Sequence, residues 1–92
     1  MGMLFKTSGE QEELKPAGQY LSLEEMQKAV GGYIELIRLN DKKALIINED
    51  GKIMKLDFNL KATALAAHVL RHDDFIVGNA VLVEEAGDGE VR

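Results

Sequence analysis

The distribution of hydrophobic and polar positions predicts two helices set among several short strands. Ser22 and Glu25 have the spacing of a capping box, and Leu21 and Met26 are placed as a hydrophobic staple across it. A helix should therefore begin at residue 23. Gly31-Gly32 supplies the left-handed residue that ends such a helix, so we expect only about two turns.

Short apolar runs separated by turn residues predict the strands. Residues 3–7 form an opening strand, and residues 33–39 and 43–48 form a hairpin around Asn40-Asp41. A turn at residues 49–52 then leads to a third antiparallel strand at 53–56. Residues 75–84 return as the last strand, with a bulge or a close backbone approach at Gly78-Asn79.

A second helix is predicted after Asn59, which is a good N-cap. The apolar stripe of this helix ends near Arg71 and consists of Ala62, Leu65, Ala66, Val69 and Leu70. The opposite face carries Lys61, Ala64, His68 and Arg71.

The resulting order, β-α-β-β-β-α-β, predicts an α+β fold. We expect a mainly antiparallel sheet of four to five strands with both helices on one face. Without the strand at 53–56, the order is that of the ferredoxin-like fold. Residues 1–85 form a single domain in this interpretation, and residues 86–92 form a frayed acidic tail. Because a chain of 92 residues buries a small core, we also expect a homo-oligomer.

Charge and composition narrow the function classes. With 16 acidic and 11 basic side chains the formal charge is -5, which disfavours direct binding to nucleic acid or to an anionic membrane. The absence of cysteine excludes thiolate chemistry and favours an intracellular setting, the cytoplasm. No apolar stretch is long enough to span a bilayer.

Catalytic groups have no recognisable arrangement, so we expect neither an enzyme nor a cofactor. No serine or threonine lies in a glycine-bracketed elbow. His68 and His72 are four residues apart and would share a helix face, which is the basis of an alternative, a metal-dependent enzyme. A third ligand at diagnostic spacing is missing, and a solvated helix end explains both histidines better. We therefore predict no metal site.

The outer face of the second helix is the best candidate for binding. Two cations and a histidine on that face would hold an anionic ligand if a second subunit completed the pocket, although a plain solvated face explains them too. The start of the helix adds free N–H groups that suit a phosphate. The candidate ligand-binding residues are Tyr33, Arg38, Asn59, Lys61, Thr63, His68 and Arg71.

Four ordered segments carry a resemblance to a known family: Gly31-Gly32-Tyr33-Ile34-Glu35, Asn48-Glu49-Asp50-Gly51-Lys52, Asn59-x-x-Ala62-Thr63 and Val77-Gly78-Asn79-Ala80-Val81. Over residues 20–83 the chain resembles a small domain family of unknown function that is common in bacteriophages and mobile elements. Phe58 replaces the proline that usually precedes the third segment. Most positions have structural explanations as helix stop, turn, bulge or cap, whereas Tyr33, Glu35 and Thr63 do not.

The resemblance implies a small accessory protein, in the host cytoplasm if a phage encodes it, that binds rather than catalyses. Our leading hypothesis is an oligomer that sequesters a small anionic ligand, such as a cyclic nucleotide immune signal, between its subunits. The alternative is an acidic protein that binds and inhibits a host defence or nucleic-acid enzyme, for which the acidic loop at residues 10–13 is the relevant feature.

Overall fold

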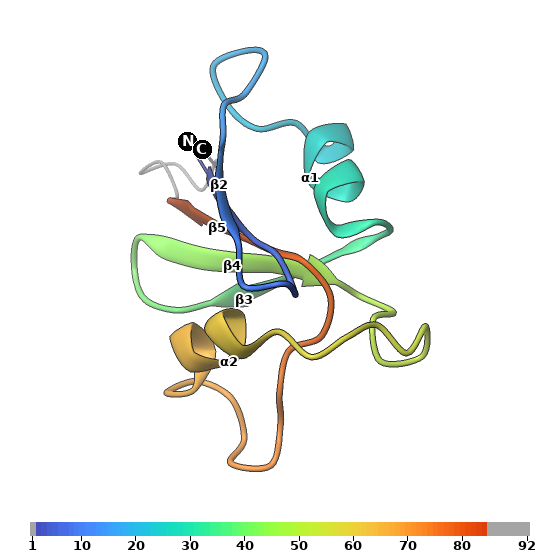
Figure 1. The fold of residues 1–92 in the computed structure, drawn as a ribbon. Coiled ribbons are helices and arrows are strands. Elements are labelled where there is room, and N and C mark those ends of the chain that lie inside the picture. Colours follow the sequence, from blue (N-terminus) through green and yellow to red (C-terminus); the bar gives the residue numbers. More distant parts are fainter. Residues whose placement is uncertain (1, 85–92) are drawn as a thin grey trace.

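A five-stranded sheet with one helix on each face forms the domain (Figure 1). The structure, a computed structural model, describes residues 2–84, so the predicted tail lies outside the described residues. The elements follow one another as β1 (Gly2–Phe5), β2 (Gln11–Leu14), α1 (Leu23–Val30), β3 (Ile34–Arg38), β4 (Lys43–Asn48), α2 (Leu60–Ala66) and β5 (Ala80–Glu84).

All strand pairs in the sheet are antiparallel, and the strand order is β2-β1-β5-β4-β3. The predicted α+β class, with a mainly antiparallel sheet and two helices, is confirmed. The hairpin of β3 and β4 is confirmed as well, with Leu36 opposite Ile46 at its centre. No helix in the described part of the chain is long and apolar enough to cross a membrane.

Helix α1 begins and ends where the sequence predicts. The hydroxyl of Ser22 accepts the N–H of Glu25, and the Glu25 carboxylate accepts the N–H of Ser22 in return. Glu25 also accepts the N–H of Ala17. These bonds to the backbone N–H groups of Ser22 and then Ala17 lower the pKa of Glu25. At the other end, Gly31 takes a left-handed conformation with φ 80°.

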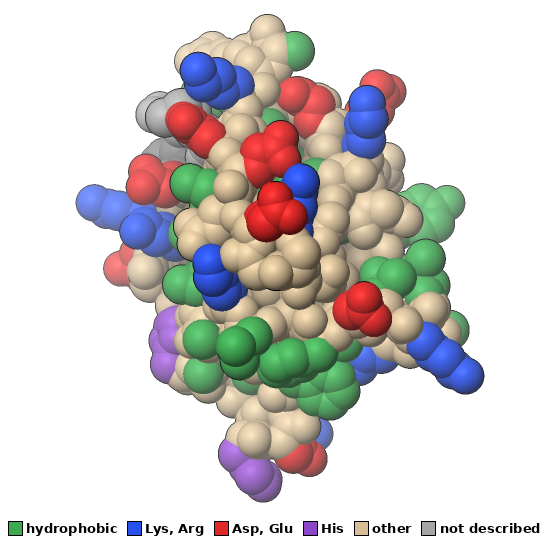
Figure 2. Space-filling model, viewed as in Figure 1, with side chains coloured by type: hydrophobic (Ala, Val, Ile, Leu, Met, Phe, Trp, Pro, Cys, Tyr) green, Lys and Arg blue, Asp and Glu red, His purple; other side chains and the backbone are tan. Residues whose placement is uncertain are grey.

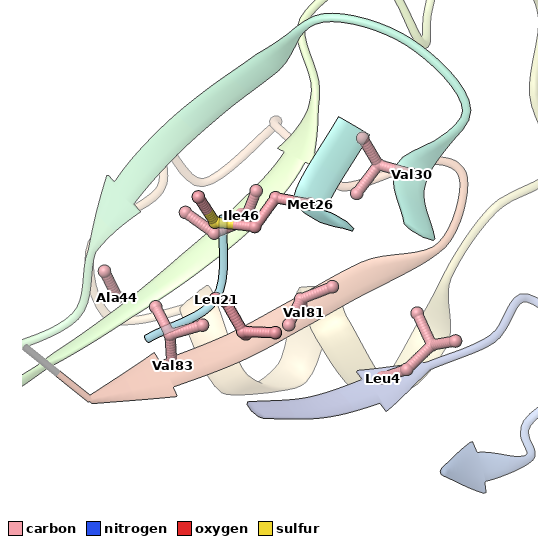
Figure 3. Packing of buried hydrophobic residues seen from close by; sticks show 8 residues of the cluster. All are labelled: Leu4, Leu21, Met26, Val30, Ala44, Ile46, Val81 and Val83. Carbon is pink, nitrogen blue, oxygen red and sulfur yellow. The ribbon is translucent and has the colours of Figure 1, made fainter. Parts of the chain in front are cut away.

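The two helices lie on opposite faces of the sheet, so the prediction that both share one face is wrong. Alternate residues of the central strands supply the two cores. Ala44 and Ile46 of β4 face α1, whereas Leu45 faces Ala62 of α2. Figure 3 shows the α1 side, where Met26 and Val30 pack with Ile46 and Val81.

The strand order also differs from the ferredoxin-like arrangement. In that fold the two central strands are parallel and each is followed by a helix on the same face. Here β5 lies between β1 and β4 and is antiparallel to both. The last strand therefore runs antiparallel to both of its neighbours. The segment that leads from α2 to this strand crosses the α2 face of the sheet.

The predicted third hairpin strand, residues 53–56, is wrong, because residues 50–55 form a tight helical turn instead. The side chain of Asn48 accepts the N–H of Asp50 at 2.8 Å and so caps the turn. Lys55 ends it in the left-handed region, with φ 58°, and the N–H of Leu56 reaches the carbonyl of Gly51. This is the hydrogen-bonding pattern of a helix stop.

Three further boundaries differ from the predicted ones. Helix α2 ends at Ala66, well before Arg71, and the chain continues in turns. The last strand begins at Ala80, because Gly78 has a left-handed φ of 80° and interrupts extended structure. The acidic loop predicted at residues 10–13 is mostly strand β2, which pairs with β1.

Candidate functional site

Several polar residues of the four family-like segments form hydrogen bonds in the interior, which make up an internal polar network. Asn59 is 1% exposed, and its amide donates to the carbonyls of Phe5 at 2.9 Å and Gly78 at 2.8 Å. Its side-chain oxygen accepts the N–H of Ala62 at 3.0 Å. The Asn59 side chain thus caps α2 and links the start of this helix to the end of β1 and to the segment just before β5. Asn59 was predicted as a cap and as a ligand contact, and the structure uses its polar atoms for the cap and these cross-links.

Thr63, which had no structural explanation from the sequence, also belongs to this network. Its hydroxyl accepts the N–H of Ile76 at 2.9 Å and lies 3.4 Å from the carbonyl of the same residue. The side chain of Asn79 accepts the N–H of Thr7 at 3.1 Å. Among the residues described, no buried side-chain nitrogen or oxygen lacks a hydrogen-bond partner.

The glycines of these segments allow close packing against the network. A Cβ atom on Gly32 would lie 2.9 Å from the amide nitrogen of Asn48, which donates to the carbonyl of Val30 at the end of α1. A Cβ on Gly78 would lie 2.7 Å from Leu56. Gly78 also has a positive φ of 80°, so this position favours glycine for its conformation as well, whereas the constraint at Gly32 is one of space alone.

The cationic face predicted on the second helix does not form. The helix ends before His68 and Arg71, and the ammonium of Lys61 reaches toward β2, where it bonds the Gly9 carbonyl at 2.7 Å and the Gln11 side chain at 2.9 Å. His68 instead lies 2.9 Å from the Leu39 carbonyl. Figure 2 shows Lys and Arg side chains spread over the visible face and interspersed with Asp and Glu.

The remaining predicted binding residues lie on the β3 side of the molecule. Tyr33 is exposed immediately before β3, and Arg38 is the last residue of that strand. Arg38 lines a groove that the sequence did not predict. The structure therefore separates Tyr33 and Arg38 from Asn59 and Thr63 in the interior and from Lys61 near β2.

The groove runs over the α2 face of β3 and β4 and has a volume of about 470 Å³. Its floor comes from the two strands, the turn after β4 closes one end, and residues 69–77 form one side. Beyond β3 no described element forms an opposite side. The apolar lining residues are Leu36, Ile37, Ile47, Ile53, Val69, Leu70, Phe75, Ile76 and Val77.

Charged residues also line the groove. Glu35, Glu49 and Asp74 supply carboxylates, and Arg38 and Lys52 supply cations. Lys52 forms an ion pair with Asp74 and lies 4.7 Å from the centre of the Phe75 ring. The bond from Lys52, followed by the N–H of Phe75, lowers the pKa of Asp74. Carboxylates outnumber cations, so the groove suits an apolar ligand with a positive group better than a phosphate.

Two other hollows are smaller. One of about 280 Å³ lies beside Gly31, Leu56 and Gly78, among the network residues. The other, about 410 Å³, borders Glu84, the last residue that the structure describes. Within residues 2–84, no three His, Asp or Glu side chains gather in a way that could hold a metal ion. The groove is thus the best-defined site for a ligand.

Its residues were missed because they come together only in the fold. Val69 and Phe75 were read as parts of a helix and a strand, whereas they lie in the irregular segment beside the groove. Both side chains are exposed in the fold, and this exposure, which the sequence does not show, would have identified them as binding residues. Glu35, the pattern residue without a structural explanation, is one of the groove's carboxylates.

These features define the chain as a small α+β domain with an internal polar network and an open groove at one sheet edge. The family of domains of unknown function DUF3846 matches residues 3–92, and the chain belongs to this family. The resemblance to a family of unknown function is thereby confirmed. No curated protein and no solved structure matches the chain.

Proposed function

We propose that the domain is a non-enzymatic binding module that holds a segment of a partner protein in the groove beside β3. The observation that carries this proposal is the groove itself, a hollow of about 470 Å³ that both apolar and charged residues line. Concave apolar sites with a few polar groups at their margins are the usual form of binding sites. A role in a phage or mobile element remains an expectation from the family resemblance.

The chemistry of the groove specifies the bound segment. Apolar side chains of the segment would enter between Ile37 and Val69, and a lysine or arginine would approach Glu35 and Glu49. These two carboxylates share a face, because Glu49 continues β4 and bonds the carbonyl of Tyr33 next to Glu35. A basic and apolar peptide therefore fits both the shape and the charge of the site.

This proposal corresponds to the protein-binding alternative of the sequence analysis, at a different surface from residues 10–13. Sequestration of a small anionic ligand stays a prediction. Its main support was a cationic helix face, and Lys61, His68 and Arg71 do not form one. Three carboxylates and two cations line the groove, and this net negative charge disfavours a phosphate.

Selection from a library of random peptides on the immobilised domain tests the proposal. Enriched peptides should combine apolar residues with lysine or arginine, and Val69→Asp should weaken their binding about tenfold or more, because it puts a charge against a buried apolar side chain. Leu23→Asp is the matched control, since Leu23 is also exposed, at 55% against 45% for Val69, but lies on α1, across the sheet.

Fluorescence anisotropy with the enriched peptides gives the dissociation constants. Loss of affinity in Val69→Asp but not in Leu23→Asp supports the groove. Equal binding by both variants contradicts it. A panel of cyclic nucleotides is titrated in parallel, and binding of a nucleotide in place of peptides would favour sequestration instead.

A further inference from the structure

The two edges of the sheet differ in how they are protected against pairing with another strand. Edge strands in soluble proteins usually carry charges, prolines or bulges that prevent such pairing. At one edge, β2 has the sequence Gln-Glu-Glu-Leu, and Lys6 forms an ion pair with Glu12 at 3.2 Å. At the other edge, β3 reads Ile-Glu-Leu-Ile-Arg, and the central Leu36 side chain is 42% exposed.

Exposed apolar side chains also gather around β3. Five large hydrophobic residues with exposed side chains lie on this strand, next to it or along its groove: Tyr33, Leu36, Ile53, Val69 and Phe75. A concentration of this kind marks a surface that another molecule covers. Leu36 lies on the α1 side of β3, opposite Ile46, whereas the groove lies on the α2 side, so exposed apolar residues surround the open edge on both faces of the sheet.

The hydrogen bonds of the hairpin show which backbone groups of β3 point outward. The Tyr33 carbonyl accepts the N–H of Glu49, and the N–H of Leu39 bonds Lys43 on the other side of the hairpin. Odd-numbered residues of β3 therefore face β4, because bonding alternates along an antiparallel strand. The N–H and carbonyl groups of Ile34 and Leu36 consequently point away from the sheet.

We infer that β3 pairs with β3 of a second copy of this chain, antiparallel and centred on Leu36. In this register Leu36 lies opposite Leu36 of the second copy, and Ile34 lies opposite Arg38. Residues whose backbone N–H and carbonyl groups point away from β4 are therefore paired with one another, as antiparallel hydrogen bonding requires. The register centred on Glu35 would oppose two carboxylates directly, which is unfavourable.

The second copy also completes the groove. A two-fold axis perpendicular to the sheet keeps both α2 faces on the same side, so Ile37 of the second copy lies opposite Glu35 on the groove side. This residue supplies an apolar margin where the single chain has none beyond β3. The pairing itself is independent of the proposed function, whereas completion of the binding site rests on it.

Charge-swap association tests the pairing. The full chain should be a dimer by native mass spectrometry and by light scattering after gel filtration. Leu36→Lys and Leu36→Glu should each be monomeric, since like charges would then face each other at the axis. Mixing the two variants should restore a dimer that contains one of each, because the introduced lysine and glutamate lie directly opposite. Leu60→Lys, an exposed position on α2, should remain dimeric.

A monomeric parent chain would overturn the inference, as would a dimer that persists in Leu36→Lys. Failure of the two variants to associate on mixing would overturn the register. Circular dichroism of each variant confirms that it is folded. Because Leu36 itself lines the groove, peptide binding by the parent chain separates the two proposals, measured at a concentration where it is a dimer and at one where dilution has made it a monomer. A monomer that binds peptide leaves the groove standing, and a dimer without peptide binding leaves the pairing standing.

Discussion

The interior around Asn59 and the face along β3 are organised in opposite ways. Around Asn59 every described buried polar side-chain atom has a partner, and Gly32 and Gly78 lie close to the side chains of Asn48 and Leu56. Along β3 the sheet ends in an open strand beside a groove with exposed apolar side chains. The family-like segments contribute to both regions: Asn59, Thr63 and Gly78 belong to the interior network, whereas Glu35, Glu49 and Lys52 line the groove.

The largest expected effect is on stability, at the interior network. Asn59→Ala should lower the free energy of unfolding by about 2–4 kcal/mol, because it removes a helix cap and leaves the carbonyls of Phe5 and Gly78 unpaired. Urea denaturation gives this value. Asn40→Ala is the control, since Asn40 also accepts two backbone N–H groups but is exposed in a turn. An equal loss in the two variants would contradict the role given to the network.

A substitution at the β3 face should leave the free energy of unfolding, again measured by urea denaturation, almost unchanged. Val69→Asp should alter the free energy of unfolding by about 0.5 kcal/mol or less, as expected for an exposed side chain. Its effect should appear in peptide affinity alone. A large loss of stability would mean that Val69 is a core residue, and the comparison between the two regions would then fail.

A smaller gain is expected at Lys55, in the turn that closes one end of the groove. Lys55→Gly should raise the free energy of unfolding by about 0.5–1 kcal/mol, because glycine adopts a positive φ without strain. Lys28→Gly, an exposed position within α1, should lower it by about 1 kcal/mol. Thermal and urea denaturation should both show a gain in stability for Lys55→Gly and a loss for Lys28→Gly.

The smallest effect concerns pH. The pKa of Glu25 is lower in the folded chain than in the unfolded one, so its contribution to stability is present above the unfolded pKa and is lost as pH falls through the folded value. Glu25→Gln should therefore make the free energy of unfolding fall less steeply on acidification. Denaturation at several pH values checks this, and an unchanged slope would argue against the capping-box carboxylate.

Local signals in the sequence predicted the local structure well. The capping box at Ser22, the stop at Gly31 and the cap at Asn59 depend on neighbouring residues, and all three are confirmed. The strand predicted at 53–56 is wrong because Asn48 caps a turn there, and an asparagine at the end of an apolar strand does not by itself reveal such a cap. The placement of the helices was wrong although β4 is apolar on both faces, a pattern that indicates a strand covered on both sides.

The candidate site was less predictable than the fold. Binding residues were sought on a helix face, and that face ends with α2 at Ala66. Thr63 proved to hold Ile76 in place, and Glu35 proved to line the groove. The groove is built from a strand, a turn and an irregular segment, and it depends on long-range packing. Such packing cannot be predicted from the local pattern of residues.

Amide hydrogen exchange at the two sheet edges tests the central claim most directly. The N–H groups of Ile34 and Leu36 point outward from β3, and those of Gln11 and Glu13 point outward from β2, since the N–H of Lys6 bonds Glu10 and sets the alternation of that hairpin. If β3 is the interface, Ile34 and Leu36 should be protected at high protein concentration and lose protection on dilution, while Gln11 and Glu13 exchange fast throughout. Fast exchange of Leu36 at every concentration would contradict the account.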